Sequence, residues 1–504
     1  MRSLSRNKGL AIATAAAAAF VGAAAPAIAQ SAPMKPNVVH IVADDLGWKD
    51  VGFNGATDIK TPNLDKLAAE GAKFTQFYAQ PMSTPTRAAL MTGRYPFRYG
   101  LQTAVIPGPA TYGLNTDEYL LPQVLKDAGY KTAIIGKWHL GHADKKFWPK
   151  QRGFDYQYGA MIGELDYFTH SDAGVRDWFR DNEVVKEKGY TTQLIGDDAV
   201  KYVEAQDGKT PFYLYLTFNA PHTPYQVPES YKAKYADIKE PTRRTYAGMV
   251  DCLDENIGRV VQALDKKGLR KNTLILFHSD NGGVRNAMFA GQMTDLSKTV
   301  LPCDNGPYRD GKGTYFEGGV RVAALANWPG QIKPQEVTGL IHVTDIMPTI
   351  TALAGGSTTK CKPIDGMNVW NVIAENKPSP RKEILLGVES FRAAIRDGDF
   401  KLIVRPLLPS SVDLYNIVED PYEKKNIADA HPEKVAAMRA RIEAVAKEAA
   451  PAFFLKYVGS AATAHGTPNL AGSGPAPAQH PNHSVTDEGF GDFETKPDPA
   501  SAGH

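Results

Sequence analysis

The sequence predicts an α/β fold, with a large, mostly parallel sheet sandwiched by helices and a smaller C-terminal antiparallel sheet packed by one helix. The first observation is that short apolar runs alternate with amphipathic stretches between residues 37 and 330. The second is a change after residue 356 to closely spaced strand patterns and one amphipathic helix. No internal repeat period is present, which argues against a repeat architecture.

Four apolar runs without polar alternation predict strands that are buried on both faces. They are Asn37–Ala43, Thr132–Ile135, Phe212–Phe218 and Thr273–Phe277. Between these runs, apolar residues recur three and four positions apart, as they do on one face of a helix. Clear examples are Leu64, Leu67 and Ala68, and the series Met249, Leu253, Ile257, Val260 and Val261. Strands that alternate with helices favour parallel pairing.

The C-terminal part has a different pattern. A helix over Ile346–Ala354 ends at a pair of glycines, and Glu383–Val388 then reads as a strand. Asp397-Gly398 is a strong hairpin signal between Arg392–Ile395 and Asp399–Val404. The next segment places four apolar residues on one helical face: Val435, Met438, Ile442 and Val445.

Both ends of the chain differ in composition from the rest. A basic start, an alanine-rich stretch (Leu10–Ala25) and Ala27-Ile28-Ala29 predict a signal peptide over 1–29, and hence a periplasmic or secreted protein. A membrane anchor is the alternative, but the stretch is short and weakly hydrophobic. From Gly459 the chain is rich in Gly, Ala, Pro and His, which predicts a disordered tail over 459–504. A main domain (35–356) and a C-terminal subdomain (357–458) lie between.

Composition excludes several classes of protein. Of the 504 residues, 43% are hydrophobic and 22% charged, as in an ordinary globular chain. The net charge of +2 and the mixing of both signs argue against a nucleic-acid binder. Three cysteines permit at most one disulfide, so no disulfide framework exists. No segment after the signal approaches the length of a membrane span, so we expect no membrane attachment after cleavage.

Polar side chains with catalytic potential follow each of the four predicted strands. Asp44 and Asp45 follow the first in chain order, Lys137 and His139 the second, His222 the third, and Asp280 and Asn281 the fourth. Because ligands of open α/β sheets bind beyond the carboxyl ends of the strands, we expect these side chains to meet at one edge. An acid after a strand is often only a helix cap or a turn former. Four such ends with complementary chemistry are harder to explain that way.

Asp44, Asp45, Asp280 and Asn281 are all hard oxygen donors. Such a set suits Ca²⁺ or Mg²⁺ better than Zn²⁺. Carboxylates this close would repel one another unless a cation lay between them. For Asp45 a structural cap is the alternative role.

Ser83 opens the segment STPTR, and an apolar helical run follows it and stops at Gly93. A serine just before a proline at a helix start lies at the positive end of the helix dipole. Taken alone, an N-cap is the simplest role for Ser83. An anionic substrate at this helix start would gain backbone N–H groups and the charge of Arg87.

Several of these segments resemble the sulfatase family, whose fold is alkaline-phosphatase-like. STPTRAALMTGR at residues 83–94 is similar to the family's first signature, in which Cys or Ser opens a five-residue motif ending in Arg, and GKWHLG at 136–141 is similar to the second. Further resemblance lies in ADDLGWKDVGF at 43–53, PH at 221–222, SDNGG at 279–283, KGTYFEGG at 312–319, DIMPTI at 345–350 and AAIRDGDFKLI at 393–403. The local style is most similar to the arylsulfatase B, or N-acetylgalactosamine 4-sulfatase, type.

The resemblance implies a sulfuric ester hydrolase of the arylsulfatase type, acting on a sulfated small molecule or a sulfated saccharide. It implies one Ca²⁺ that faces residue 83, with these ligands: Asp44, Asp45, Ser83, Asp280 and Asn281. Ser83 would be oxidised to formylglycine (3-oxoalanine), whose hydrate attacks sulfur. Many relatives have Cys where this chain has Ser83, which implies a dedicated radical-type sulfatase-maturing enzyme as a partner.

The resemblance also assigns the remaining roles. Arg87 and Lys137 would steady the hydrated residue 83, and His139 would be the general base that lets sulfate leave. His222 and Lys312 would bind the sulfate together with Lys137, and His222 would protonate the leaving oxygen. A structural histidine beside Trp138 is the alternative for His139. A solvated loop charge is the alternative for Lys312.

Two rival functions stay open on the sequence alone. A phosphomonoester or phosphonate ester hydrolase shares the superfamily, although it typically carries a histidine where Asn281 stands. A non-catalytic binder of sulfated glycans would keep Ser83 unmodified.

Overall fold

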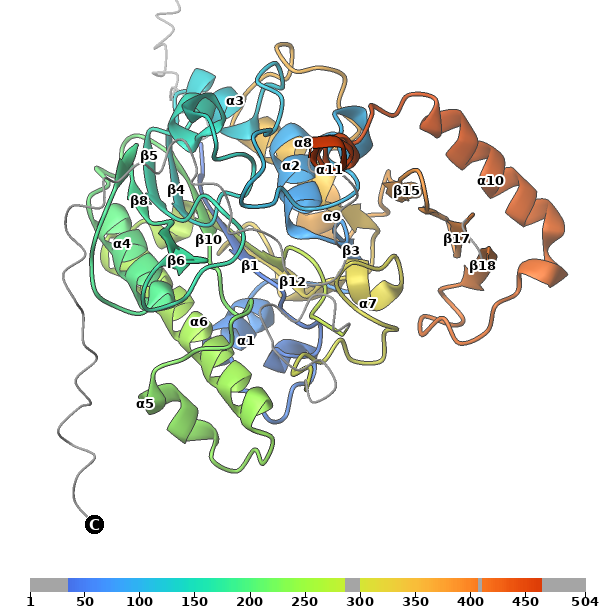
Figure 1. The fold of residues 1–504 in the computed structure, drawn as a ribbon. Helices are drawn as coiled ribbons and strands as arrows, with labels where there is room; N and C mark the ends of the chain where they lie inside the picture. Colours follow the sequence, from blue (N-terminus) through green and yellow to red (C-terminus); the bar gives the residue numbers. More distant parts are fainter. Residues whose placement is uncertain (1–34, 286–299, 407–409, 465–504) are drawn as a thin grey trace, which may run out of the picture. The chain divides into compact units, whose positions relative to one another are not determined.

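A ten-stranded sheet forms the centre of the protein, whose computed structural model describes residues 35–285, 300–406 and 410–464 (Figure 1). Its strand order is β13-β2-β12-β11-β1-β10-β4-β5-β8-β9. In chain order the strands are β1 (Asn37–Ala43), β2 (Ala72–Phe74), β4 (Lys131–Gly136), β5 (Tyr156–Gly159), β8 (Phe179–Arg180), β9 (Glu183–Val184), β10 (Phe212–Thr217), β11 (Thr273–Ser279), β12 (Ala324–Asn327) and β13 (Gln335–Val337).

The five central strands β11-β1-β10-β4-β5 all pair in parallel, and antiparallel partners join on both sides. The predicted mostly parallel sheet is therefore confirmed. The four apolar runs form β1, β4, β10 and β11, and they differ from the prediction only at their ends.

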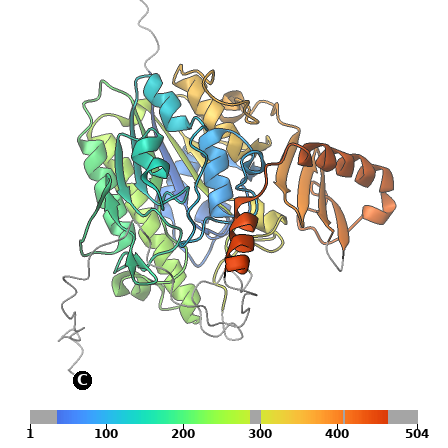
Figure 2. The same cartoon turned by 45° about the horizontal axis from the view of Figure 1, so that its top comes forward.

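Helices cover both faces of the sheet. Alternate residues of each strand therefore pack into two separate hydrophobic cores, one on each face. Val38 and Val42 of β1 pack with one set of helices, whereas Val39 and Ile41 pack with the other. The first set is α2 (Ser83–Thr92), α3 (Leu121–Asp127) and α8 (Ile346–Leu353); the second is α1 (Pro62–Ala69), α4 (Thr191–Glu204) and α6 (Pro241–Lys266). Figure 2 shows α4 and α6, in green, on one side of the sheet and α2, in blue, on the other. This double burial explains why the strands lack polar alternation.

Smaller elements complete the main part of the chain. Two pairs of short strands lie outside the large sheet: β3 (Phe77–Tyr78) with β14 (Ile341–His342), and β6 (Ser171–Asp172) with β7 (Val175–Arg176). Short helices are α5 (Glu229–Lys232), α7 (Glu317–Val320) and α9 (Trp370–Glu375). Val372 and Ile373 of α9 pack in the core of the large sheet. The small C-terminal sheet therefore begins later than residue 357.

The predicted C-terminal antiparallel sheet is present as β15-β16-β17-β18, and α10 packs against it. The bounds are β15 (Glu383–Val388), β16 (Ala393–Asp397), β17 (Phe400–Arg405), β18 (Ser411–Asn416) and α10 (Pro432–Ala446). Met438, Ile442 and Val445 of α10 face the sheet, as their spacing predicts. β18 was not predicted, because its sequence mixes polar and apolar residues and only part of it is buried.

The end of the described chain corrects one boundary. A helix, α11 (Phe453–Ala464), continues past Gly459, where composition had placed the start of the disordered tail. Alanine is a good helix former, so a segment poor in apolar periodicity can still extend a helix. The predicted signal peptide and the predicted tail from residue 465 lie outside the described residues.

The helices and the cysteines can be compared with the expectations from composition. None of the helices in the described part of the chain is both long and apolar enough to span a bilayer. Cys252, Cys303 and Cys361 are all free thiols.

A buried charge network joins the small sheet to the main part of the chain. Lys401 of β17 lies 2.9 Å from the carboxylates of both Glu317, in α7, and Glu423. Tyr78 also donates to Glu317, at 2.6 Å. All three charged side chains are inaccessible to solvent, so each depends on its partners for neutralisation.

We expect Lys401→Ala to lower the free energy of unfolding by about 3–5 kcal/mol, because it leaves Glu423 buried without this cation and leaves Glu317 with Arg321, at 3.3 Å, as its remaining ion-pair partner. Lys434→Ala is the matched control: Lys434 pairs with Asp397 at 2.9 Å, but both side chains are partly exposed. That variant should lose about 1 kcal/mol or less. Urea denaturation of both variants measures the difference, and equal losses would contradict the role given to burial.

Candidate active site

The central strands end level with one another, and this brings the predicted site residues together. Ala43 of β1 pairs with Ser279 of β11, Val42 pairs with Thr217 of β10, and Thr217 pairs with Gly136 of β4. The backbone continues this alignment, since Asp280 N–H donates to Ala43 O and Lys137 N–H donates to Thr217 O. Asp44, Lys137 and Asp280 therefore begin their loops at the same edge, as the sequence predicts.

The backbone at this edge adopts conformations that constrain the sequence. Asp45 and His139 have φ values of 61° and 60°. Residues other than glycine rarely adopt such backbone angles, and those that do are often found at functional sites. Gly136, at φ 115°, opens the loop that carries Lys137 and His139. A Cβ at this position would lie 1.7 Å from Thr217 O, so only glycine fits between the two strands.

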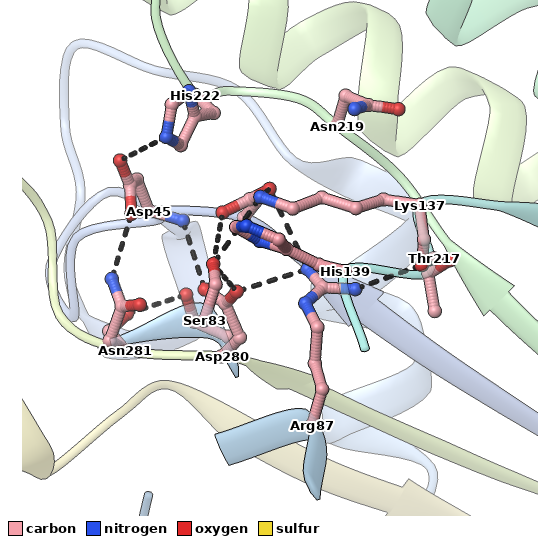
Figure 3. A network of polar contacts seen from close by, with 12 residues as sticks. Asp45, Ser83, Arg87, Lys137, His139, Thr217, Asn219, His222, Asp280 and Asn281 are labelled. Carbon is pink, nitrogen blue, oxygen red and sulfur yellow. Dashed lines mark hydrogen bonds and ion pairs between the residues drawn. The ribbon is translucent and has the colours of Figure 1, made fainter. Parts of the chain in front are cut away.

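Ser83 is the first residue of α2, and its side chain points away from its own helix. Its hydroxyl is within hydrogen-bonding distance of two carboxylates, Asp280 Oδ2 at 2.5 Å and Asp44 Oδ1 at 3.2 Å. Lys137 Nζ lies 3.3 Å from Ser83 Oγ. The N-cap position belongs to Met82, so Ser83 does not cap the helix through its side chain. The N-cap alternative is therefore wrong, and Ser83 lies at the centre of a charged cluster (Figure 3).

Each of three buried carboxylates in this cluster has a cationic partner. Lys137 pairs with Asp44. Arg87 Nη2 donates to Asp280 Oδ2 at 3.0 Å. Lys312 Nζ donates to Asp45 Oδ2 at 2.8 Å, so the alternative of a solvated loop charge is wrong for this lysine. The six side chains come from five separate segments of the chain and are almost wholly buried.

Burial and charge act in opposite directions on these groups. Burial would raise the pKa of Asp44, but nearby positive charges, led by Lys137, lower it below its usual range. In the same way, Lys312 leads the charges that lower the pKa of Asp45. For Lys137, burial prevails and lowers the pKa in spite of Asp44. The neighbouring cations thus keep Asp44 and Asp45 ionised although both are buried.

Hydrogen bonds to carbonyl groups fix the tautomers of the two histidines. His139 Nε2 lies 3.2 Å from Ile106 O and must donate its hydrogen there, which leaves Nδ1 as the basic nitrogen. Within the described part of the chain, Nδ1 is buried and has no hydrogen-bond partner. Burial, followed by the charges of Lys137 and Arg87, holds the pKa of His139 well below its usual value. His139 is therefore a neutral imidazole with a free lone pair.

His222 has the opposite arrangement. Its Nδ1 donates to Thr223 O at 2.6 Å, and its Nε2 accepts from Lys312 Nζ at 3.0 Å. Tyr167 holds the loop, because its hydroxyl group lies 2.8 Å from Asn219 O and 2.9 Å from His222 O and donates its one hydrogen between these two carbonyl groups. Because Nδ1 carries the proton, Nε2 is the nitrogen of His222 that holds the lone pair, and it faces Lys312.

The oxygen donors near Ser83 fit a hard divalent cation. Asn281 donates its amide N–H to Asp45 Oδ1 at 2.8 Å, and its buried Oδ1 has no partner among the described residues. Oxygen atoms of Asp44, Asp280 and Ser83 lie close by. Asp44, Asp45 and His222 also form a group with donor atoms within 4.8 Å of one another, but His222 Nε2 already faces Lys312. An orphaned amide oxygen beside three carboxylates fits Ca²⁺ or Mg²⁺.

Every predicted site residue lies in this region. The sequence analysis did not identify the residues that hold the loops of the site in position. Thr84 donates to His139 O at 3.0 Å and accepts from Ile106 N–H at 3.1 Å, so it joins two loops of the site. Gly163 lies so close to His139 that a Cβ would approach the ring to 2.3 Å. Thr84 belongs to the STPTR segment, but nothing in that segment identifies its distant partners.

Comparison with known proteins gives consistent results. Residues 36–357 match the sulfatase family. The chain is 34% identical over 478 residues to arylsulfatase J of Mus musculus, covering 83% of this chain and 77% of that protein. It is 35% identical over 364 residues to the N-acetylgalactosamine-6-sulfatase of Mus musculus, covering 68% and 67%. The crystal structure of Ps i-CgsB in complex with k-i-k-neocarrahexaose superposes with a TM-score of 0.75 at 33% identity, covering 86% and 98%.

These matches confirm the family but do not carry the 4-sulfatase type. The two relatives are an arylsulfatase J and a 6-sulfatase, so the 4-sulfatase branch stays a prediction. The phosphonate monoester hydrolase of Agrobacterium radiobacter shares the fold at a TM-score of 0.57 and 20% identity. The fold alone therefore does not separate sulfate from phosphonate chemistry.

We expect Thr84→Val to lower the free energy of unfolding by about 1–3 kcal/mol, because Ile106 N–H and His139 O lose a buried partner. Thr84→Ser is the control, since it keeps the hydroxyl and loses only a methyl group, at about 1 kcal/mol or less. Thermal or urea unfolding of the two variants measures this. If the serine variant lost as much as the valine variant, packing of the methyl group would explain the effect instead.

Proposed function

The chain belongs to the sulfatase family and is a sulfuric ester hydrolase, and we propose on this basis that it removes sulfate esters from sugars by means of an oxidised Ser83 and one Ca²⁺. The observation that carries the proposal is the convergence of Asp44, Lys137 and Asp280 on the Ser83 hydroxyl. A sugar substrate is favoured by the relatives: one is named for N-acetylgalactosamine 6-sulfate chemistry, and another binds a neocarrahexaose.

An unmodified Ser83 would be a poor catalyst, because an ordinary sulfate ester of serine is hard to hydrolyse. Conversion of Ser83 to formylglycine would supply a hydrated aldehyde, one hydroxyl of which attacks sulfur while the other later allows sulfate to leave. Arg87 and Lys137 surround this position, with Lys137 Nζ at 3.3 Å from Ser83 Oγ. Fixed cations of this kind hold the polar head of residue 83 in one orientation.

The oxygen atoms of Asp44, Asp45, Asp280, Asn281 and residue 83 would hold Ca²⁺. The ion would supply positive charge next to the sulfate oxygens. Lys137, Lys312 and Arg87 pair with the three carboxylates. A bound cation would take over part of this neutralisation and leave the lysines free to contact the sulfate group.

The two histidines suit opposite proton transfers. His139 Nδ1 carries a lone pair without a partner among the described residues, which suits a general base toward residue 83. His222 Nε2 accepts from Lys312 Nζ at 3.0 Å, and this hydrogen-bonded pair would deliver a proton to the leaving oxygen. Both residues line the cavity above Ser83 together with Lys312.

Export and maturation complete the proposal. The N-terminal sequence supports cleavage near Ala29 and a periplasmic or secreted enzyme. The serine at position 83 calls for a sulfatase-maturing enzyme of the radical type as its partner.

We expect protein purified from its native host to contain formylglycine at position 83 and to hydrolyse an aryl sulfate at least about 100-fold faster, by kcat/KM, than the matching aryl phosphate. Mass spectrometry of the peptide that carries residue 83 should show the loss of two hydrogens. The N-terminal peptide of the same sample, starting after Ala29, tests export.

The outcomes separate the rival functions. An intact serine together with binding of sulfated sugars would favour a non-catalytic binder. A preference for phosphate or phosphonate esters would favour the other branch of the superfamily.

We expect Asp280→Ala and Asp280→Asn to weaken Ca²⁺ binding by about 100-fold or more and to abolish sulfate ester hydrolysis. The asparagine variant keeps the shape of the side chain, which guards against simple misfolding. Calorimetric titration measures affinity, and Ca²⁺ should raise the unfolding temperature of the wild type only.

Asp207→Ala is the control, because Asp207 forms an exposed ion pair with Lys131, which begins β4 and so lies at the opposite end of that strand from Lys137. This variant should bind Ca²⁺ normally. Normal affinity in the Asp280 variants would show that the ligand set is wrong.

A further inference from the structure

Lys312 lies in a loop whose backbone is joined to the residues just before Ser83. The side chain of Lys312 reaches the site, where its Nζ donates to Asp45 Oδ2 at 2.8 Å. The N–H of the next residue, Gly313, donates to Pro81 O at 2.8 Å. Because a lysine side chain is long and flexible, the backbone that carries it must be fixed if the ammonium group is to keep one position.

An arginine of the small C-terminal sheet binds the same loop. Arg392, immediately before β16, donates from Nη1 to Gly313 O. Its guanidinium carbon lies 4.6 Å from the centre of the Tyr315 ring, two residues farther along the loop. Gly313 is therefore held through both of its backbone polar groups, its N–H by Pro81 and its carbonyl by Arg392.

Glu389 fixes the orientation of this arginine. Arg392 Nε donates to Glu389 Oε1 at 3.0 Å, and the Tyr315 hydroxyl donates to the same oxygen. The Glu389 side chain is inaccessible to solvent, and the arginine neutralises its charge. The sheet also approaches the loop closely at Gly387 of β15, where a Cβ would lie 1.8 Å from the Tyr315 hydroxyl oxygen. The small sheet and the loop are thus tightly packed against each other.

The ammonium group of Lys312 lies at the site, whereas Arg392 acts from outside it. Lys312 lines the cavity above Ser83, which encloses about 470 Å³, and its Nζ donates to His222 Nε2 at 3.0 Å. Within the described part of the chain, neither Arg392 nor Glu389 lines this cavity. Any effect of the arginine on a bound sulfate group is therefore transmitted through the loop.

We propose that Arg392 is a positioning residue, which holds Gly313 and thereby fixes the ammonium group of Lys312 for binding of the sulfate group. Without the arginine, the Gly313 carbonyl loses its charged donor, and the loop and the lysine can move away from the position that binds sulfate. The inference rests on the proposed sulfatase function, in which Lys312 binds sulfate. It gives the small C-terminal sheet a part in sulfate recognition without direct contact.

Inorganic sulfate, the product of the proposed reaction, is the probe that tests this role. In protein that holds Ca²⁺, we expect Arg392→Ala to bind sulfate about tenfold more weakly in a calorimetric titration. KM for an aryl sulfate should rise by a similar factor, while kcat changes less. Affinity for Ca²⁺ should equal that of the wild type, because the loop can move without displacing the proposed ligands.

Glu389→Gln is a second and milder variant, which serves if the alanine variant does not fold. It keeps the size of the side chain and removes the charge that orients Arg392. We expect it to weaken sulfate binding in the same direction by a smaller factor. Unchanged sulfate affinity in this variant and in Arg392→Ala would overturn the positioning role.

Arg405→Ala is the matched control. Arg405 belongs to β17 of the same sheet, and its guanidinium carbon lies 5.6 Å from the centre of the Phe316 ring, but it donates to Ser411 and Asp413. This variant should bind sulfate normally. Equal weakening in Arg405→Ala, or loss of Ca²⁺ binding together with sulfate binding in Arg392→Ala, would overturn the specific role of Arg392. A matured wild type that neither binds sulfate nor hydrolyses sulfate esters would instead overturn the proposed function.

Discussion

Three carboxylates buried at one edge of the sheet carry a charge that the fold must neutralise, and much of the surrounding structure follows from this requirement. An isolated buried carboxylate is strongly unfavourable, so each acid needs a cation or a metal ion. The chain supplies Arg87 from α2, Lys137 from the end of β4 and Lys312 from a distant loop. The same pairings place Ser83, in the first turn of α2, against Asp44 and Asp280. Neutralisation and assembly of the site are therefore one physical event.

Parallel pairing is what brings these groups to one place. In a parallel sheet every carboxyl end lies at the same edge, and here the register makes four strands end level. The helices that cover both faces exclude water from the strands, so the charged groups meet where the effective dielectric constant is low. Interactions with a sulfate group are stronger there than in water, because the dipoles and charges are already oriented.

Sequence patterns predict the elements whose residue types are constrained by burial, and little else. The strands β1, β4, β10 and β11 are apolar throughout because both faces are buried, so their sequences identify them and the acids that follow. β18 was not predicted because only two of its six residues are buried. The last part of α11 was not predicted because its composition is typical of a disordered tail. Thr84 escaped for another reason: its partners, Ile106 and His139, lie 22 and 55 residues away, and a hydroxyl leaves no periodic signal. Which cation pairs with which acid likewise depends on contacts far apart in sequence.

The cavity above Ser83 also shows that sequence patterns identify only some of the residues that line a functional site. Lys312 contacts Asp45 and His222. Ser83 contacts Asp44 and Asp280. Charge therefore constrains these residue types and makes them recognisable in the sequence. Glu164 and Phe454 also line the cavity, but they lie outside the charge pairs that hold this cluster together. The residues that line the rest of the cavity must therefore be identified from the folded structure.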